Sequence, residues 1–292
     1  MIFSKLVPRS IKSKIRKRFE KTVVKTVYSA TKPYELKISQ TPELKDQIAV
    51  VTGGSGAIGR AICIRLASMG AKVYVVSRSE SSAMKVVDEI RQLGLKAEPL
   101  VFNVADDASI ETAFDLVKDI EGRLDILVCC AGGGSREAMA SLSNQSVSVI
   151  DEILNTNLRG AILCTRKAAQ IMKPQISGKI VLISSAVGIQ GLANYSEYGA
   201  AKSGMFGFVK SVALELGSYN INVNCVSPGF IQRGEYDDNQ LEWLKKTNPM
   251  HKVGSLEDIA CAVAFIVSNQ ACFITGQNLC VDGGRTLGLY GD

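Results

Sequence analysis

From residue 46 onward, short apolar runs alternate with longer stretches in which apolar residues recur at helical spacing. A strand that reads as a continuous apolar run is buried on both faces of its sheet. Alternation of such strands with helices predicts a parallel sheet covered by helices on both sides. The predicted strands are Ile48–Thr52, Val73–Ser77, Ala97–Asn103, Ile126–Cys130, Ile180–Ser184, Asn222–Val226 and Asn278–Val281. The predicted helices lie at 57–69, 81–93, 107–120, 147–172, 196–217 and 256–268. We therefore expect one doubly wound α/β domain over residues 46–292, with about seven strands and with its ligand at their carboxyl ends.

Residues 1–45 follow a different pattern. Five apolar residues recur every fourth position in a field of lysines and arginines: Ile11, Ile15, Phe19, Val23 and Val27. This spacing predicts a basic amphipathic helix, and the proline-containing stretch Thr31–Leu44 predicts a linker to the domain. Three roles stay open for the extension: contact of residues 1–30 with an anionic membrane surface, docking to another subunit, or an organelle transit peptide.

The charge of the chain is concentrated in this extension. Residues 1–46 contain 12 Lys and Arg against 4 Asp and Glu, so they carry +8, whereas the whole chain carries +6 and the remainder therefore −2. A near-neutral body argues against nucleic-acid binding, because a duplex binder places basic residues on its folded surface. No apolar stretch approaches the length of a membrane span. We expect a cytoplasmic protein, with peripheral membrane contact through the N-terminal helix as an open alternative.

Cysteine and histidine usage points to neither a metal site nor a hydrolase. None of the eight cysteines is in a C-x-x-C pair and most lie in apolar runs, which predicts buried, reduced thiols and no metal site. His251 is the single histidine, and no G-x-S-x-G sequence precedes it. We expect His251 to lie in a loop without a catalytic role.

A tyrosine followed four residues later by a lysine is the first candidate for chemistry. Four residues make about one helical turn, so both side chains lie on one helix face, where the ammonium favours the phenolate and lowers the tyrosine pKa. Such a pair can act as a general acid toward a carbonyl oxygen. Two pairs have this spacing, Tyr198 with Lys202 and Tyr28 with Lys32. An apolar run ending in hydroxyls, at 178–185, precedes Tyr198 alone, so we assign the function to Tyr198.

A glycine-rich turn, Thr52–Gly59, follows the first predicted strand and opens the first predicted helix. Glycines let the backbone approach a pyrophosphate, and the helix N-terminus supplies free N–H groups to it. Sites for NAD place a carboxylate at the end of the second strand. Here that position is Ser77, followed by Arg78, which can bind a 2′-phosphate. The sequence therefore predicts NADP(H), the alternative being that Arg78 is a solvated surface charge.

With these residues assembled, residues 46–286 resemble the short-chain dehydrogenase/reductase family. The matching blocks are Thr52–Gly59, Cys129–Gly132, Asn157–Gly160, Ser184-Ser185, Tyr198–Lys202, Asn224–Gly229, Ile274–Gln277 and Val281–Gly284. The resemblance implies a Rossmann-type fold, a homodimer or homotetramer, and a small carbonyl or alcohol substrate. It also implies that the cofactor is bound by Gly53, Ser55, Gly56, Ile58, Gly59, Ser77, Arg78, Asn103, Val104, Ala131, Gly132, Tyr198, Lys202, Pro228, Gly229 and Ile231.

The resemblance assigns catalytic roles to Asn157, Ser185, Tyr198 and Lys202. In the family's mechanism the tyrosine donates the proton while the nicotinamide transfers hydride to the carbonyl carbon. The serine hydroxyl bonds the substrate oxygen, and the lysine lowers the tyrosine pKa and binds the nicotinamide ribose. The asparagine holds a water that relays protons to the lysine.

Four positions depart from the family pattern: Ala57, Cys129-Cys130, Asn103 and Arg233. Ala57 replaces a glycine of the turn, the two cysteines replace asparagines that steady the central strand, and Asn103 replaces an aspartate near the adenine. Arg233 stands where a threonine commonly contacts the nicotinamide carboxamide. None removes a catalytic group, and Arg233 is open to two interpretations, an anionic-substrate contact or a surface charge.

The predicted function is reduction of a ketone or oxidation of a secondary alcohol with NADP(H), most like a 3-oxoacyl-acyl-carrier-protein reductase. A sugar or polyol dehydrogenase is the alternative, and a cofactor-bound scaffold with little turnover is the alternative from another class. The intact set of catalytic residues argues against a scaffold. The substrate walls should come from residues 133–144, 186–197 and 230–253, whose composition favours a polar or thioester-linked ketone.

Overall fold

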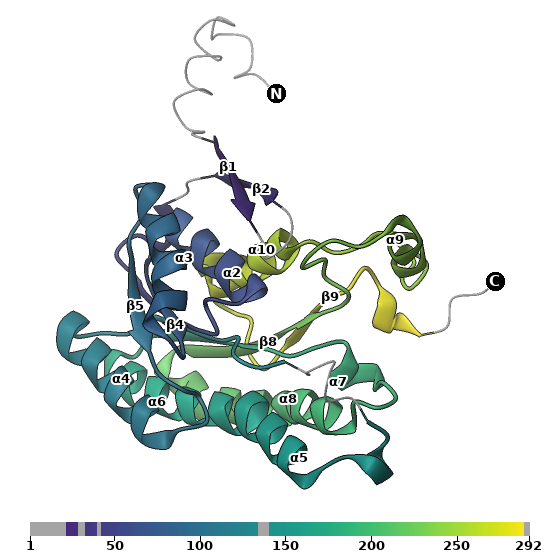
Figure 1. Cartoon of the computed structure of the whole chain (residues 1–292). Helices are drawn as coiled ribbons and strands as arrows, with labels where there is room; N and C mark the ends of the chain where they lie inside the picture. Colours follow the sequence, from purple (N-terminus) through teal and green to yellow (C-terminus); the bar gives the residue numbers. More distant parts are fainter. Residues whose placement is uncertain (1–21, 29–32, 40–41, 134–139, 289–292) are drawn as a thin grey trace, which may run out of the picture.

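A computed structural model describes residues 22–28, 33–39, 42–133 and 140–288 (Figure 1). Its centre is a seven-stranded parallel sheet in the order β5-β4-β3-β6-β7-β8-β9. Its strands are β3 Ile48–Thr52, β4 Lys72–Ser77, β5 Ala97–Val101, β6 Ile126–Cys129, β7 Gly178–Ile183, β8 Ile221–Pro228 and β9 Asn278–Val281. The seven predicted strands are therefore confirmed, with ends that shift by at most two residues. The order reverses between β3 and β6, and in open α/β sheets ligands bind at such a reversal.

Helices cover both faces of the sheet, as predicted, and Figure 1 shows the two layers. One layer contains α2 (Ala57–Ser68), α3 (Glu80–Gln92) and α10 (Leu256–Val267). The opposite layer contains α4 (Asp107–Glu121), α6 (Gly160–Gln175) and α8 (Ser196–Leu216). Three more α-helices lie in the described part of the chain: α5 Val147–Leu154, α7 Val187–Gln190 and α9 Asp238–Lys245.

Burial explains why the apolar runs form the sheet. Every residue of β3, β6 and β8 is buried, and side chains of β3 point alternately into two apolar clusters, one beneath each helical layer. Val51 packs with the α2 layer and Val50 with the α4 layer. Each fully buried aliphatic side chain of this kind contributes about 1.5–3 kcal/mol. The two-sided burial holds the strand ends rigidly, and these ends carry the candidate site.

The helix predicted to run through Val23 and Val27 is wrong over the described part of the extension. Residues Thr22–Tyr28 form β1, which pairs antiparallel with β2, Pro33–Ser39, and the two make a separate two-stranded sheet. β1 contains five β-branched residues and a tyrosine, and such residues prefer extended backbone to helix. The predicted linker 31–44 likewise contains β2. The remainder of the predicted helix lies outside the described residues.

Leu44, which the sequence assigned to the extension, belongs to the body. The 3₁₀ turn Pro42–Leu44 places Leu44 in the α2-layer cluster with no exposed surface, and the Leu44 N–H donates to the Met69 carbonyl at 2.9 Å. Deleting residues 1–41 should therefore leave the free energy of unfolding of the body unchanged, whereas deleting residues 1–44 should lower it by about 2–5 kcal/mol. Urea denaturation of both truncated proteins measures the difference. Equal stabilities would contradict the packing of Leu44.

Two further sequence expectations bear on the described residues. Among them, no helix combines the length and the apolarity needed to cross a bilayer. Cys63, Cys129, Cys164 and Cys225 are free and buried, as expected, but Cys272 and Cys280 are exposed and the prediction is wrong for them. Cys272 lies in the connection before β9, and Cys280 lies on β9, which is the last strand of the sheet among the described residues.

Candidate active site

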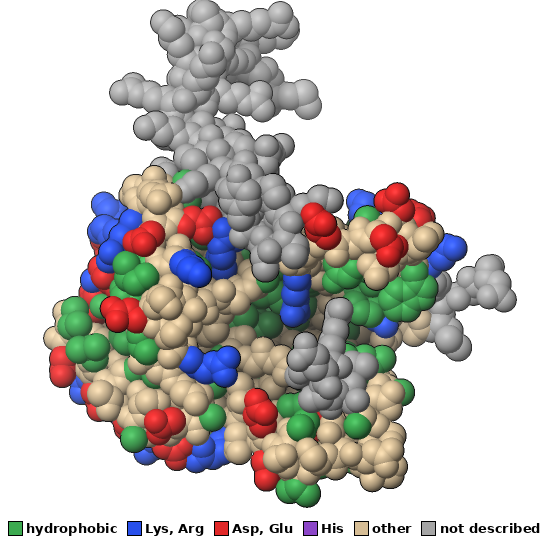
Figure 2. All heavy atoms as spheres, viewed as in Figure 1, with side chains coloured by type: hydrophobic (Ala, Val, Ile, Leu, Met, Phe, Trp, Pro, Cys, Tyr) green, Lys and Arg blue, Asp and Glu red, His purple; other side chains and the backbone are tan. Residues whose placement is uncertain are grey.

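The candidate site is a cleft of about 1070 Å³ at the carboxyl ends of the parallel strands. Figure 1 shows α7 and α9 on opposite sides of these strand ends, and Figure 2 shows the hollow with hydrophobic side chains within it. All residues that the sequence proposed for catalysis or cofactor binding line this one cleft. They come from the ends of six strands and from the helices that follow, so the fold brings together residues that are spread along the chain from Gly53 to Ile231.

The glycine-rich turn is packed too closely for larger residues. Gly53 has φ +65°, and a Cβ there would lie 2.8 Å from the Cα of Ala131. A Cβ on Gly59 would lie 2.2 Å from the Gly53 carbonyl oxygen. The turn leads into α2, whose N-cap residue, Gly56, provides no side-chain cap. The first N–H groups of α2 are thus available to an anion, which fits the pyrophosphate of a dinucleotide.

The end of β4 carries hydroxyls and a guanidinium. A carboxylate at this position would repel a 2′-phosphate, and none is present there. The Ser55 hydroxyl donates to the Ser77 hydroxyl at 3.0 Å, which joins the glycine turn to the strand end. Arg78 is exposed, lines the cleft, and forms no ion pair with any residue in the described part of the chain. Ser79 and Ser82 line the same end and were not proposed from the sequence.

Tyr198 and Lys202 lie one turn apart on α8, as the spacing predicted. The Lys202 ammonium is 5.6 Å from the centre of the Tyr198 ring and donates to the Ile183 carbonyl at 2.9 Å. The Ser184 hydroxyl donates to the Lys202 carbonyl at 2.8 Å, which ties α8 to the end of β7. The next residue, Ser185, acts on the tyrosine, because its hydroxyl lowers the pKa of the phenol. This junction of β7 with α8 is why the upstream hydroxyls distinguished Tyr198 from Tyr28.

The pKa of Tyr198 is shifted in the direction opposite to the one expected from Lys202 alone. Burial raises the pKa of Tyr198, while the hydrogen bond from Ser185 and the charge of Arg233 oppose the rise. Burial also lowers the pKa of Lys202 to about 8. Lys202 has therefore lost its charge in the pH range where Tyr198 titrates, and a neutral amine does not favour a phenolate. Arg233, which the sequence left open, is the cation that lowers the tyrosine pKa.

This electrostatic arrangement predicts a pH dependence. Alcohol oxidation needs the deprotonated phenol, so the rate should rise with pH as Tyr198 loses its proton. Replacing Arg233 with glutamine removes a charge that lowers this pKa, so the alkaline rise of kcat should move to higher pH. The pH profile of kcat for alcohol oxidation measures the shift. The matched variant Arg78→Gln should leave the profile in place, and an unmoved or acid-shifted profile in Arg233→Gln would contradict the assignment.

Asn157 lies in a π-helical segment, Asn155–Arg159, that interrupts the single helix predicted over 147–172. Its amide donates to the carbonyls of Ile153 and Gly133, at 3.0 and 3.2 Å. Its Oδ1 atom is buried and has no partner among the described residues. A buried carbonyl oxygen without a partner costs about 1–3 kcal/mol, so it is typical of a site for a bound water. The wider turn of a π-helix is a frequent feature of functional sites.

Two departures from the family pattern are compensated by hydrogen bonds to other groups. The Thr52 hydroxyl accepts from the backbone N–H groups of Cys130 and Ala131, at 3.0 and 3.1 Å, and so holds the end of β6. Thr52 was not proposed as a site residue. The Asn103 Oδ1 accepts from the Ala105 N–H at 3.1 Å, so it stabilises its own turn. Burial raises the pKa of Cys130 to about 11, which keeps this cleft thiol protonated at neutral pH.

The substrate end of the cleft is more apolar than the sequence suggested. Phe230 packs against Trp243 of α9 with ring centroids 5.8 Å apart, and Tyr195 packs edge-on against Tyr198 at 6.2 Å. Residues of α5 and the π-helical segment that were not predicted also contribute: Val149, Glu152, Ile153 and Thr156. Part of the predicted wall, 134–139, lies outside the described residues. The sequence pattern did not predict that α5 lines the cleft, because α5 reaches the cleft only through the packing of the fold.

Comparison with known proteins identifies relatives of this chain. The family model described as enoyl-(acyl carrier protein) reductase matches residues 53–286. The 3-oxoacyl-acyl-carrier-protein reductase FabG of Escherichia coli (strain K12) is 38% identical over 242 residues, which cover 82% of this chain and 96% of the relative. The cyclohexanol dehydrogenase of Rhodococcus sp. (strain TK6) is 35% identical over 267 residues, covering 83% of this chain and 97% of the relative.

Solved structures show the same architecture. A candidate gluconate dehydrogenase from Agrobacterium tumefaciens has a TM-score of 0.80 and 28% identity, covering 86% of this chain and 100% of its own. A candidate short-chain alcohol dehydrogenase from Sinorhizobium meliloti 1021 has a TM-score of 0.79 and 30% identity, covering 85% and 99%. Fold, motif order and relatives together place the chain among the oxidoreductases of the short-chain dehydrogenase/reductase family.

Proposed function

We propose that this oxidoreductase interconverts a ketone and a secondary alcohol with NADP(H), and that Tyr198 is its general acid and base. One observation carries the proposal: Ser185, Tyr198 and Lys202 meet in the same cleft as the glycine-rich turn. A dinucleotide held at the turn reaches along the cleft to the tyrosine, which is the arrangement that hydride transfer to a carbonyl requires.

The described side chains suit distinct parts of this reaction. The Ser185 and Tyr198 hydroxyls bind the substrate oxygen, and Tyr198 gives it a proton as negative charge develops there. Lys202, held by the Ile183 carbonyl, donates to the cofactor's ribose, and a water on the Asn157 Oδ1 atom returns the proton toward Lys202. The bound nicotinamide supplies or accepts the hydride.

A 3-oxoacyl thioester is the first candidate substrate, since FabG of Escherichia coli is a 3-oxoacyl-acyl-carrier-protein reductase. The apolar wall of Phe230, Trp243 and Leu244 favours a second candidate, an alicyclic alcohol or ketone, in agreement with the cyclohexanol dehydrogenase relative. Because a candidate gluconate dehydrogenase has a similar structure, the test also includes a substrate for the sugar or polyol alternative. We also propose a homodimer or homotetramer, which light scattering during size-exclusion chromatography measures.

The test is NADPH oxidation by the full chain with acetoacetyl thioester, cyclohexanone and a keto sugar acid as substrates. Turnover of one of them identifies the class. If the protein binds NADPH but reduces none of these three substrates, the result supports the scaffold alternative and contradicts the enzymatic proposal.

The cofactor preference is a separate prediction. NADPH should bind at least about tenfold more tightly than NADH, because a charge-assisted contact of Arg78 with the 2′-phosphate is worth about 1.5–3 kcal/mol. Arg78→Asp should reverse the preference, since a carboxylate repels the phosphate and accepts from a ribose 2′-hydroxyl. Fluorescence titration of both cofactors measures the ratio. Equal dissociation constants in the unmodified protein would refute the role of Arg78.

A further inference from the structure

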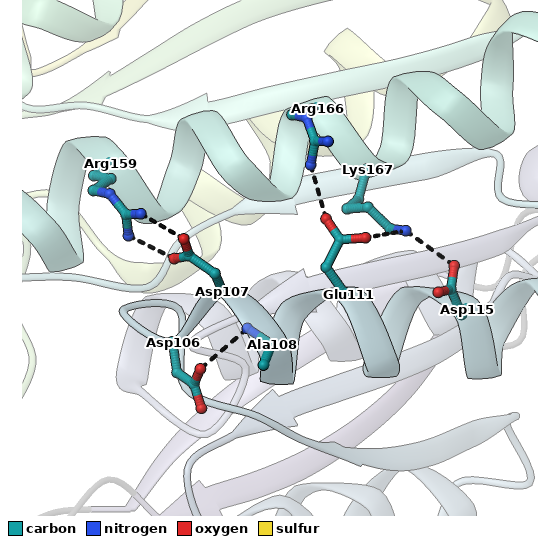
Figure 3. Close-up of polar contacts among 8 residues, drawn as sticks. All are labelled: Asp106, Asp107, Ala108, Glu111, Asp115, Arg159, Arg166 and Lys167. Carbon is teal, nitrogen blue, oxygen red and sulfur yellow. Dashed lines mark hydrogen bonds and ion pairs between the residues drawn. The ribbon is translucent and has the colours of Figure 1, made fainter.

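The described arginines include two that line the cleft and five that form ion pairs elsewhere. The ion pairs are Arg60 with Glu89, Arg91 with Glu98, Arg123 with Asp125, Arg159 with Asp107 and Arg166 with Glu111. Figure 3 shows the last two pairs. Together with Lys167, which lies between Glu111 and Asp115, they form a row of ion pairs between α4 and the segment that leads into and includes α6. Arg78 and Arg233 line the cleft instead, and neither forms an ion pair or hydrogen bond with a residue in the described part of the chain. The cleft thus presents two guanidinium groups without a protein counter-ion.

The two guanidinium groups lie at opposite ends of the proposed reaction site. Arg78 follows β4, at the end assigned to the adenosine 2′-phosphate. Arg233 follows β8 in the loop that also contains Phe230, and its charge acts on Tyr198, Lys202 and Cys130. Its side chain is exposed to the cleft and needs no rearrangement of a salt bridge to accept a ligand.

The charged residues that line the cleft as a whole favour an anion. Among the described residues that line the cleft, Glu152 is the carboxylate, against Arg78, Lys202 and Arg233. Glu152 lies on α5, in the helical layer opposite α2, whereas Arg233 follows the strand β8. An uncompensated guanidinium recognises a carboxylate through two parallel N–H···O bonds, which adds orientation as well as affinity.

The wall beside Arg233 is apolar and held in place. The Arg285 guanidinium lies 4.3 Å from the centre of the Phe230 ring, and the backbone carbonyl of Arg285 accepts from the Gln190 amide at 2.7 Å. Phe230 in turn packs against Trp243. This chain of contacts links α7 to α9 across the entrance and fixes an aromatic surface next to the free guanidinium.

We propose that the substrate is a ketone with an apolar body and a carboxylate near the reacting carbonyl, and that Arg233 binds this carboxylate. The inference rests on the function proposed above and adds the substrate class. The apolar body packs against Phe230 and Trp243 while the carbonyl oxygen meets Ser185 and Tyr198. Arg233 then selects among ketones by charge and orients the carbonyl toward the tyrosine.

The experiment compares three keto acids with their methyl esters: benzoylformate, acetoacetate and 4-oxocyclohexanecarboxylate. For at least one pair, kcat/KM with NADPH should favour the acid about tenfold or more, since a charge-assisted bond is worth about 1.5–3 kcal/mol. Arg233→Gln should abolish that preference through a higher KM for the acid, leave the ester KM unchanged, and leave the NADPH dissociation constant unchanged. Arg233→Lys, which keeps the charge but not the paired donors, should restore part of the preference.

Arg78→Gln is the matched control. It should weaken NADPH and leave the acid-to-ester ratio as it is, which is the opposite pattern to Arg233→Gln. Reduction of the esters at the same efficiency as the acids overturns the inference and leaves the proposed function standing. Loss of NADPH affinity in Arg233→Gln with an intact acid preference also overturns it, because Arg233 then belongs to the cofactor site. Failure of both members of every pair counts against the proposed function, and the inference falls with it.

Discussion

Replacing Tyr198 with phenylalanine should lower the rate of hydride transfer by about 10²–10⁴, the usual contribution of a general acid. The ring and its packing against Tyr195 are kept, and the phenol proton is lost. NADPH should still bind, because the substitution leaves unchanged the glycine-rich turn that is proposed to hold the pyrophosphate. Single-turnover reduction measures the chemical step directly, and the NADPH dissociation constant measures the binding.

Tyr28→Phe is the matched control for this variant. Tyr28 has the same spacing to a lysine, but it lies on strand β1, so the spacing does not place the two side chains on one helix face. The Tyr28→Phe protein should react at the unmodified rate. An unchanged rate in Tyr198→Phe, or a loss in Tyr28→Phe, would show that the wrong tyrosine has been assigned.

Replacing Gly59 with alanine should reduce NADPH affinity by at least about 100-fold, because two or more charge-assisted bonds to the pyrophosphate are disturbed. An added Cβ would lie 2.2 Å from the Gly53 carbonyl oxygen, so the turn and the start of α2 must separate. Overpacking of this kind costs about 1–3 kcal/mol, so the free energy of unfolding should fall as well. Fluorescence titration and urea denaturation measure the two effects.

Variants at two other glycines distinguish an effect on protein stability from an effect on NADPH affinity. A Cβ on Gly56 would come within 3.3 Å of the Gly53 oxygen and no closer to any other atom, so Gly56→Ala should weaken NADPH while the protein keeps its stability. Gly207, inside α8, has open space where a Cβ would be added. Gly207→Ala should leave NADPH affinity unchanged and should not lower stability, since alanine is the better helix residue. A stable Gly59→Ala protein with full cofactor affinity would contradict the close packing of the turn.

The sheet could be predicted from the sequence because its strands are buried on both faces. Continuous apolar runs such as Ile126–Cys129 have no other stable place in a folded chain, and β9 was predicted to the residue. The β1–β2 pair was missed because every fourth apolar residue satisfied a helical pattern while the β-branched content favoured a strand. A helical period is weak evidence over so few residues, and pairing with β2 was not visible in the pattern.

Most of the proposed cofactor residues follow strand ends that the apolar pattern located, whereas Asn157, Tyr198 and Lys202 lie on helices and were assigned from motif spacing. The electrostatics of these residues could not be predicted from the sequence. The direction of the Tyr198 pKa depends on how deeply the phenol and Lys202 are buried, and burial is a property of the packed cleft. The π-helical turn at Asn157 and the aromatic wall of Phe230 and Trp243 likewise arise from packing between distant segments, which local spacing does not encode.

Trp243 should make ligand binding measurable by intrinsic tryptophan fluorescence. It is the single tryptophan of the chain, it lines the cleft, and 60% of its surface is exposed. Its emission arises from one indole at the substrate end, without background from other tryptophans. A ligand that covers the indole should shift this emission to shorter wavelength, and a reduced nicotinamide nearby should accept its excitation energy. Occupancy of the cofactor end and of the substrate end can then be followed separately in one unlabelled sample.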